Sequence, residues 1–290
     1  MLESSDTLWR YMKLSTFLLL LEGKAWFPSV ASLRAGDPLE AGLGAELYDL
    51  LWKHLVEAEG ESQAIEWISR DKDWPDGHPL SNASELYTPV YGKTIADEIA
   101  RLRAVWCWYK SGNESAAMWS VYGHQGVAVM TDRVRLTKAL PEGKSFQIDD
   151  IIYVDRRGAE ERNIKRIIRR QPDLIRRPHF LKAVEYQHEQ EVRVAGHCPA
   201  GAKGLMVTGI QPQILIREVL ISPLLPSAEA ETIERIVAKR FETSTVSVKR
   251  SSLVAESYVA PFIESINERL YGTTDEQIDT DILPQEFRTL

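Results

Sequence analysis

Short stretches of alternating apolar and polar residues occur along the chain, and they predict β-strands because successive side chains of a strand point to opposite faces. Two of them, 8–12 (LWRYM) and 104–110 (AVWCWYK), are rich in the aromatic residues that strands favour. A third, 126–131 (GVAVMT), is largely apolar, as expected of a strand buried on both faces. The other strand-like stretches are 25–28, 146–154, 186–195, 218–221 and 245–249.

Apolar residues that recur every three to four positions predict helices between these strands. The clearest series is Leu47, Leu50, Leu51, His54 and Leu55. Asn113 is expected to cap a helix at 114–122. Other helices are expected at 15–21, 93–103, 157–170, 180–185, 227–241 and 261–270.

The order of these elements predicts a single α+β domain over residues 1–272, followed by an acidic tail at 273–290. We expect a mixed or antiparallel split β-sheet core with flanking helices. A helical insertion is expected near residues 44–104.

Composition places the chain among ordinary folded proteins. Of its 290 residues, 44% are apolar and 27% are charged, which excludes extended disorder, collagen-like repeats and coiled coils. The two cysteines, Cys107 and Cys198, are too far apart in the sequence for a disulfide framework or a zinc motif. The longest apolar run, Phe17 to Leu21, is far shorter than the roughly 20 residues that cross a bilayer. We therefore expect a cytoplasmic protein without a membrane partner.

The net charge of −7 is distributed unevenly. The segment from Arg156 to Arg177 contains nine basic and three acidic residues, so it carries +6 and the rest of the chain −13. Such a segment is typical of a solvated helix face, but it also favours a nucleic-acid-binding or nuclease-like defence effector. A further alternative is a non-enzymatic module that binds a protein partner of a defence complex through the apolar helix face around Leu47 to Leu55.

All eight tryptophans lie in the first 119 residues. This skew predicts a large aromatic core in the N-terminal half, and the alternative is that some of the rings line a binding cleft. Trp9 and Trp119 are the candidates for such a cleft, because one adjoins Arg10 and the other lies close to Tyr122.

Two carboxylates and a guanidinium form the most informative group. In the predicted strand 186–195, Glu189, Glu191 and Arg193 share one face, with the two carboxylates about 7 Å apart. This arrangement suits a site that holds a ribose and polarises a reacting centre, or alternatively a surface ladder of ion pairs. The chain has no nucleophile elbow, phosphate-binding glycine loop or zinc-protease motif, and its histidines share no metal-ligand spacing, so no metal is expected.

Two other segments add aromatic rings and a second guanidinium to the candidate site residues. Tyr122 ends the predicted helix at 114–122, where it either packs in the core or points toward a pocket. Arg10 is a candidate for holding a phosphate with two N–H donors, and Tyr11 is a candidate for stacking on a base.

Several short motifs occur in a characteristic order over residues 8 to about 240. They include Leu8-Trp-Arg-Tyr11, Asp37-Pro-Leu-Glu40, Met118-Trp-Ser-Val-Tyr122, Phe180-Leu-Lys182 and Glu189-Gln-Glu-Val-Arg193. Together they resemble the bacterial family known as domain of unknown function 2971. That family label implies no activity.

The layout also resembles, more loosely, the ADP-ribosyltransferases of the diphtheria-toxin and cholera-toxin type. Those enzymes begin with a strand that bears His or Arg, continue with a central Tyr or Ser, and end with a strand that bears a catalytic Glu. The resemblance implies an ADP-ribosyltransferase-like layout and an NAD-using enzyme, either an ADP-ribosyltransferase or an NAD glycohydrolase. It implies an effector of anti-phage defence or a toxin, with a protein or nucleic acid as acceptor.

The same resemblance implies a role for each candidate residue. Glu191 would bind the nicotinamide-ribose hydroxyl and stabilise the oxocarbenium-like transition state, while Glu189 would orient the acceptor. Arg10 or Tyr11 would take the first position, and Arg10 would hold the NAD pyrophosphate. Tyr122 or Ser120 would take the middle position, with Tyr122 packed on the nicotinamide. Trp119 and Arg193 are the neighbouring candidates for NAD binding.

Overall fold

The computed structural model describes residues 7–35, 40–41, 45–69, 92–155, 174, 176–242 and 244–253. The chain divides into a unit of Met1–Arg250 and a unit of Ser251–Leu290, and all strands and helices given below belong to the first. The predicted helix at 261–270, the acidic tail at 273–290 and most of the basic segment lie outside the described residues.

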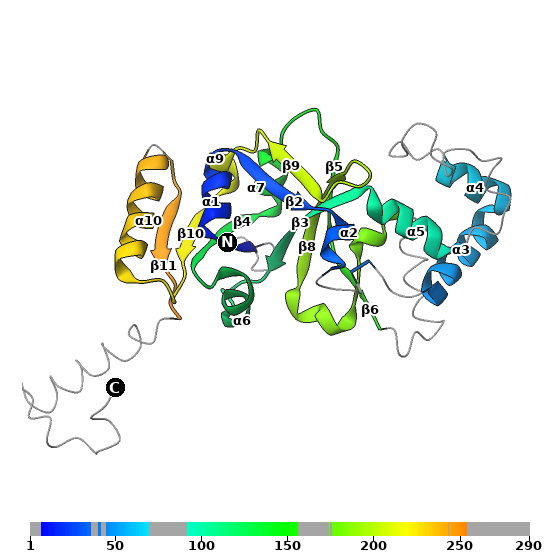
Figure 1. The fold of residues 1–290 in the computed structure, drawn as a ribbon, viewed down its shortest axis with the longest axis horizontal. Helices are drawn as coiled ribbons and strands as arrows, with labels where there is room; N and C mark the ends of the chain where they lie inside the picture. The colour runs from blue at the N-terminus through cyan, green and yellow to red at the C-terminus, as the bar shows by residue number, and fades with distance from the viewer. Residues whose placement is uncertain are drawn as a thin grey trace, which may run out of the picture. The chain divides into compact units, whose positions relative to one another are not determined.

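One large mixed sheet forms the centre of the first unit (Figure 1). Its strands lie in the order β11 (Ser247–Arg250), β10 (Glu218–Ile221), β4 (Gly126–Asp132), β1 (Thr7–Lys13), β3 (Arg103–Lys110), β8 (Glu191–His197) and β5 (Phe146–Asp150). β10 and β11 are parallel, whereas the other neighbours in this sheet are antiparallel. Two small pairs accompany it: antiparallel β2 (Lys24–Pro28) with β9 (Gly204–Thr208), and parallel β6 (Ile152–Val154) with β7 (Leu181–Ala183).

Helices precede, follow and interrupt these strands, which confirms the predicted mixture of helices and strands. They are α1 (Leu14–Leu21), α2 (Val30–Leu33), α3 (Ala45–Glu59), α4 (Glu61–Ser69), α5 (Gly92–Arg101), α6 (Ala116–Met118), α7 (Arg133–Ala139), α9 (Pro212–Leu215) and α10 (Ser227–Arg240). α3, α4 and α5 fall within the predicted insertion, and their apolar faces form a separate small core around Leu51, Leu55 and Ile99. None of the helices in the described ranges is long and apolar enough to span a membrane.

The sheet buries both of its faces, as its apolar strands require. Leu8, Met12, Trp106 and Trp108 belong to the main core on one face. Trp9 and Tyr11 pack with Trp119 on the other. The predicted aromatic core is therefore present for Trp9, Trp106, Trp108 and Trp119, whereas Trp26 is 42% exposed.

β1 and β3 pair with each other over fewer residues than each of them pairs with its neighbour on the other side. β1 pairs with β4 along its whole length, from Thr7↔Asp132 to Lys13↔Gly126. With β3 it pairs only at Leu8↔Lys110 and Trp9↔Tyr109. We refer to the point where the two strands part, after Trp9 in β1 and before Tyr109 in β3, as the β1–β3 divergence.

Three predictions of local structure near this divergence are wrong. The stretch 186–195 is not one strand: a 3₁₀ helix, η7 (Val184–Glu189), precedes β8, and Gln190 between them adopts a left-handed conformation with φ of 41°. The stretch 180–185 is not a helix, because it contains β7. Ser115, not Asn113, caps α6, and its hydroxyl accepts a hydrogen bond from the Met118 amide. α6 then continues as a π-helical turn, η4 (Trp119–Gly123).

Candidate functional site

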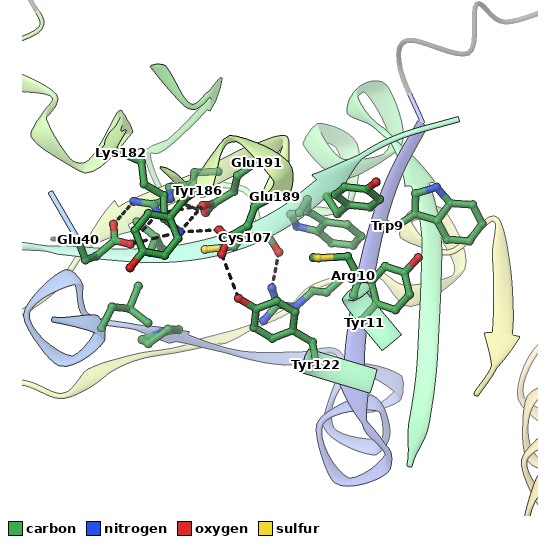
Figure 2. Close-up of a pocket in the computed structure, with 17 residues that line it drawn as sticks. Trp9, Arg10, Tyr11, Glu40, Cys107, Tyr122, Lys182, Tyr186, Glu189 and Glu191 are labelled. Carbon is green, nitrogen blue, oxygen red and sulfur yellow. Dashed lines mark hydrogen bonds and ion pairs between the residues drawn. The ribbon is translucent and has the colours of Figure 1, made fainter. Parts of the chain in front are cut away.

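A cavity of about 420 Å³ opens at the β1–β3 divergence (Figure 2). Residues from β1, β3, the α6–η4 segment and the stretch from β7 to β8 line it. The candidates that line it are Arg10, Tyr11, Tyr122, Glu189, Glu191 and Arg193, together with Trp9. Trp119 and Ser120 are not among the lining residues. The fold thus brings together the first, middle and last candidate segments, although Arg10 and Tyr122 are 112 positions apart in sequence and Tyr122 and Glu189 are 67 apart.

Arg10 occupies the divergence itself. Strand alternation places it on the same face as Leu8 and Met12, and its Nη1 donates to the Cys107 carbonyl of β3. Its guanidinium carbon lies 5.4 Å from the centre of the Trp106 ring, a cation–π distance. Burial lowers the pKa of Arg10.

Two buried donors at this end of the cavity lack an acceptor among the described residues. They are Nε of Arg10 and Nε1 of Trp108. Arg10 also makes no ion pair with a carboxylate in the described part of the chain. Because unpaired buried donors are costly, this end of the cavity suits a ligand group that is anionic and rich in acceptors.

Aromatic rings form the wall between β1 and the α6–η4 segment. Tyr11 packs edge-on against Trp119, with 4.8 Å between ring centres, and its hydroxyl accepts a hydrogen bond from the Ser115 amide. Trp119 is buried behind Tyr11 and donates to Glu114. Tyr122 is 46% exposed and reaches across to Glu189, whereas Ser120 points to solvent.

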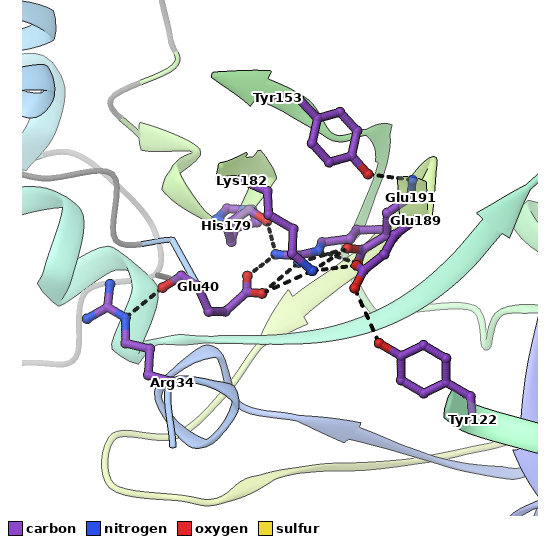
Figure 3. A network of polar contacts seen from close by, with 9 residues as sticks. Arg34, Glu40, Tyr122, Tyr153, His179, Lys182, Glu189 and Glu191 are labelled. Atoms are coloured by element: carbon purple, nitrogen blue, oxygen red, sulfur yellow. Dashed lines mark hydrogen bonds and ion pairs between the residues drawn. The ribbon is translucent and has the colours of Figure 1, made fainter. Parts of the chain in front are cut away.

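A buried network of ion pairs centres on Arg193 at the opposite end (Figure 3). Its Nε and Nη2 donate to the two oxygens of Glu191, at 2.5 and 3.0 Å. Its Nη1 and Nη2 donate to the two oxygens of Glu40, at 2.5 and 3.0 Å. Nη1 also donates to the His179 carbonyl at 2.7 Å. A guanidinium has five N–H donors, so these bonds use its full capacity.

Lys182 connects the remaining carboxylate to this network. Its Nζ lies 2.5 Å from Glu189, 3.5 Å from Glu191 and 3.7 Å from Glu40. The other oxygen of Glu189 accepts a hydrogen bond of 3.3 Å from the Tyr122 hydroxyl. The five side chains of Glu40, Glu189, Glu191, Lys182 and Arg193, which we call the charge network, therefore hold three negative and two positive charges.

The left-handed residue Gln190 explains why both Glu189 and Glu191 face the cavity. Its backbone lies outside the conformations that non-glycine residues usually adopt, and it joins a helical turn to a strand at this point. The backbone is fixed there by hydrogen bonds from the Lys110 amide to the Gln190 carbonyl and from the Glu191 amide to the Tyr153 hydroxyl.

The charge network shifts the pKa values of its members. Burial alone would raise the pKa of Glu191, but the guanidinium of Arg193 and the ammonium of Lys182 lower it to about 2. Burial alone would lower the pKa of Lys182, but Glu191 and Glu40 raise it above its usual range. Burial, and then the charge of Glu189, raises the pKa of Tyr122 to about 12. At neutral pH the carboxylate of Glu191 is ionised, Lys182 is protonated and cannot act as a nucleophile, and the Tyr122 phenol keeps its proton.

Two members of the network, Glu40 and Lys182, were not among the predicted site residues. Both occur in motifs that carry the family resemblance, Asp37-Pro-Leu-Glu40 and Phe180-Leu-Lys182. Arg34 fixes the backbone of Glu40 by donating to its carbonyl at 2.9 Å and to that of Ala41 at 3.0 Å. The sequence signal that could have identified Glu40 and Lys182 is a single charged residue with apolar residues on both sides of it.

No family model, curated protein or solved structure matches the chain. The resemblance to domain of unknown function 2971 therefore stays a prediction. In the described ranges no group of three or more His, Cys, Asp and Glu residues has the geometry of a metal site.

Proposed function

We propose that the cavity at the β1–β3 divergence binds NAD and that the protein cleaves the bond between nicotinamide and ribose, as an NAD glycohydrolase or an ADP-ribosyltransferase. One observation carries the proposal: Arg10, Tyr122, Glu189 and Glu191 line the same cavity. The looser family resemblance implies that these residues bind NAD or act on it. Their convergence on one cavity supports that assignment.

The cavity has the size and lining that a nucleotide requires. Its volume of about 420 Å³ lies in the range of small-molecule sites, roughly 300–1,000 Å³. Arg10, with its unsatisfied Nε, offers a position for the pyrophosphate. The half-exposed ring of Tyr122 offers a surface for the nicotinamide.

The carboxylates suit the charge that develops during the reaction. The bond between C1′ and the nicotinamide nitrogen breaks, and both electrons go to the nitrogen, which neutralises the pyridinium. Positive charge develops on the ribose ring, where fixed negative charge stabilises it. Water, or a nucleophile of an acceptor, then forms a bond to C1′ and releases one proton. The resemblance implies that Glu191 stabilises this positive charge and that Glu189 orients the acceptor.

The sheet supports an ADP-ribosyltransferase-like layout in two respects. The arginine lies on the first strand, and the Glu-x-Glu pair spans the junction of η7 and β8, so that Glu191 begins a later strand across the divergence. A role as a toxin or as an anti-phage effector follows if cleavage depletes cellular NAD.

The decisive measurement is nicotinamide release. We expect purified protein incubated with NAD to release nicotinamide, with ADP-ribose or a modified acceptor as co-product, in assays with and without cell extract as acceptor source. The matched control is the double variant Glu189→Gln/Glu191→Gln, which keeps both side-chain shapes and removes both charges. Absence of nicotinamide release in every condition would reject the proposed function.

A further inference from the structure

The two carboxylates of the Glu-x-Glu pair differ in how much of their bonding capacity the protein already uses. Glu191 is enclosed: its side chain is 4% exposed, and each of its oxygens accepts a hydrogen bond from Arg193. The ammonium of Lys182 lies 3.5 Å from the second oxygen. These bonds use three of the roughly four acceptor sites of the Glu191 carboxylate, against two at Glu189, so Glu191 has less capacity left for a ligand.

Arg193 cannot follow a movement of Glu191 without losing hydrogen bonds of its own. All five of its N–H donors have acceptors, shared among Glu40, Glu191 and the His179 carbonyl. A movement of Glu191 toward the cavity would leave a buried donor of Arg193 without a partner, which is costly.

Glu189 is held at one oxygen only. Its Oε2 accepts a hydrogen bond from Lys182 at 2.5 Å, while the one donor to its Oε1 among the described residues is the Tyr122 hydroxyl, at 3.3 Å. This second bond is long for an O–H···O hydrogen bond, which is typically near 2.7–2.8 Å. Tyr122 comes from η4 on the other side of the cavity and is half exposed, so the bond spans the cavity and a ligand hydroxyl can replace it.

We propose that Glu189 is the carboxylate that contacts the ribose hydroxyls of the ligand, in exchange for Tyr122, and that Glu191 is a positioning residue. This inference rests on the proposed function. It differs from the resemblance, which implies that Glu191 binds the ribose hydroxyl. Glu191 acts through Lys182, which it and Glu40 keep protonated and directed at Glu189. The network has one net negative charge, and Glu189 presents it to the cavity.

Ligand-free protein tests the division of roles without reference to NAD. We expect Glu191→Gln to lower the melting temperature by roughly 10 °C, because the amide NH₂ cannot accept one of the two Arg193 bonds and so leaves a buried guanidinium donor without an acceptor. Glu189→Gln should lower it by less than about 3 °C, because Lys182 keeps two other carboxylates. The reverse order of the two variants would overturn the proposal even if NAD is cleaved. If NAD is not cleaved but this order holds, the proposed function fails and the division of roles stands.

Substrate analogues test the contact itself. Cleavage rates of NAD and of analogues lacking the 2′- or 3′-hydroxyl of the nicotinamide ribose are compared in each variant. For NAD, Glu189→Gln should lower kcat/KM by about 10–100-fold, and most of this loss should vanish with one of the deoxy analogues. The loss caused by Glu191→Gln should be the same for all three substrates. A Glu191 effect that depends on the hydroxyl, with a Glu189 effect that does not, would overturn the proposal.

Tyr122→Phe provides a further arm, because it keeps the ring and removes only the hydroxyl. We expect affinity for ADP-ribose to stay unchanged or to rise a few-fold, since the competitor for Glu189 is gone. A loss of affinity of more than about 10-fold would show that the hydroxyl binds ligand directly and would count against the exchange.

Discussion

Each end of the cavity contains an arginine, but among the described residues only Arg193 is paired with carboxylates, whereas the partly buried Arg10 is not. Arg193 has two carboxylates, Glu40 and Glu191, each bound through both oxygens. Arg10 has a backbone carbonyl, an aromatic ring and a buried Nε that finds no acceptor in the described part of the chain. A matched buried charge contributes to stability once its partners exist, whereas an unmatched one is retained for what it binds. We therefore expect the Arg193 end of the cavity to be structural and the Arg10 end to be the one that binds the proposed ligand.

The largest effect is expected at the matched end. Arg193→Met should lower the free energy of unfolding by roughly 3–5 kcal/mol, because Glu40 and Glu191 stay buried and lose the guanidinium that binds both, which leaves them the more distant ammonium of Lys182. Urea unfolding followed by tryptophan fluorescence measures it. The control is Arg133→Met, which breaks the half-exposed ion pair between Arg133 and Asp150 and should cost less than about 1 kcal/mol. Equal losses in the two variants would show that the network contributes no more than a surface pair.

The next effect is a dependence of stability on pH. The pKa of Glu191 is about 2 in the folded protein, against 4.5 ordinarily, with burial opposing and Arg193 causing the decrease. A group with a lowered folded pKa contributes stability above its unfolded pKa, and this contribution is lost as the pH falls through the folded value. We expect wild type to exceed Glu191→Gln by roughly 3 kcal/mol above about pH 5, with the difference shrinking between pH 4.5 and 2.

Unfolding of both proteins in urea at a series of pH values between about 7 and 2.5 provides this difference. The subtraction removes the acid sensitivity that other carboxylates share between the two proteins. A difference that stays constant down to pH 2.5 would mean that the ionised form of Glu191 is not preferentially stabilised by the fold.

The sequence predicted the strands of this region better than it predicted the site. β1, β3 and β4 were found because alternating or continuous apolar residues reflect burial, which acts on each residue separately. The turn before β8 was missed because no Gly or Pro separates Tyr186–Gln190 from the strand-forming residues Val192 and Val194, and the left-handed backbone of Gln190 marks the boundary between η7 and β8.

The partners of the site residues were beyond prediction for a different reason. Glu40 pairs with Arg193 across 153 positions of sequence, and no local pattern encodes such a contact. Arg10, Tyr122 and Glu191 were identified from residue type and from the order of motifs. That information indicates which residues meet, but not that Arg193 already occupies both oxygens of Glu191.

The smallest effect on stability is expected at the unmatched end, where the effect on binding is large. Arg10→Met removes a partly buried charge that has no counter-ion among the described residues, and the unbranched apolar chain of Met can still pack on Trp106, so the free energy of unfolding should change by no more than about 1 kcal/mol. The lost charge-assisted bonds should lower affinity for ADP-ribose by about 10–100-fold, measured by titration calorimetry. Arg10→Lys keeps the charge and loses the fork of donors, so it should recover only part of that affinity. If Arg10→Met instead destabilises the protein as much as Arg193→Met, Arg10 is a structural residue, and the distinction between the two ends of the cavity does not hold.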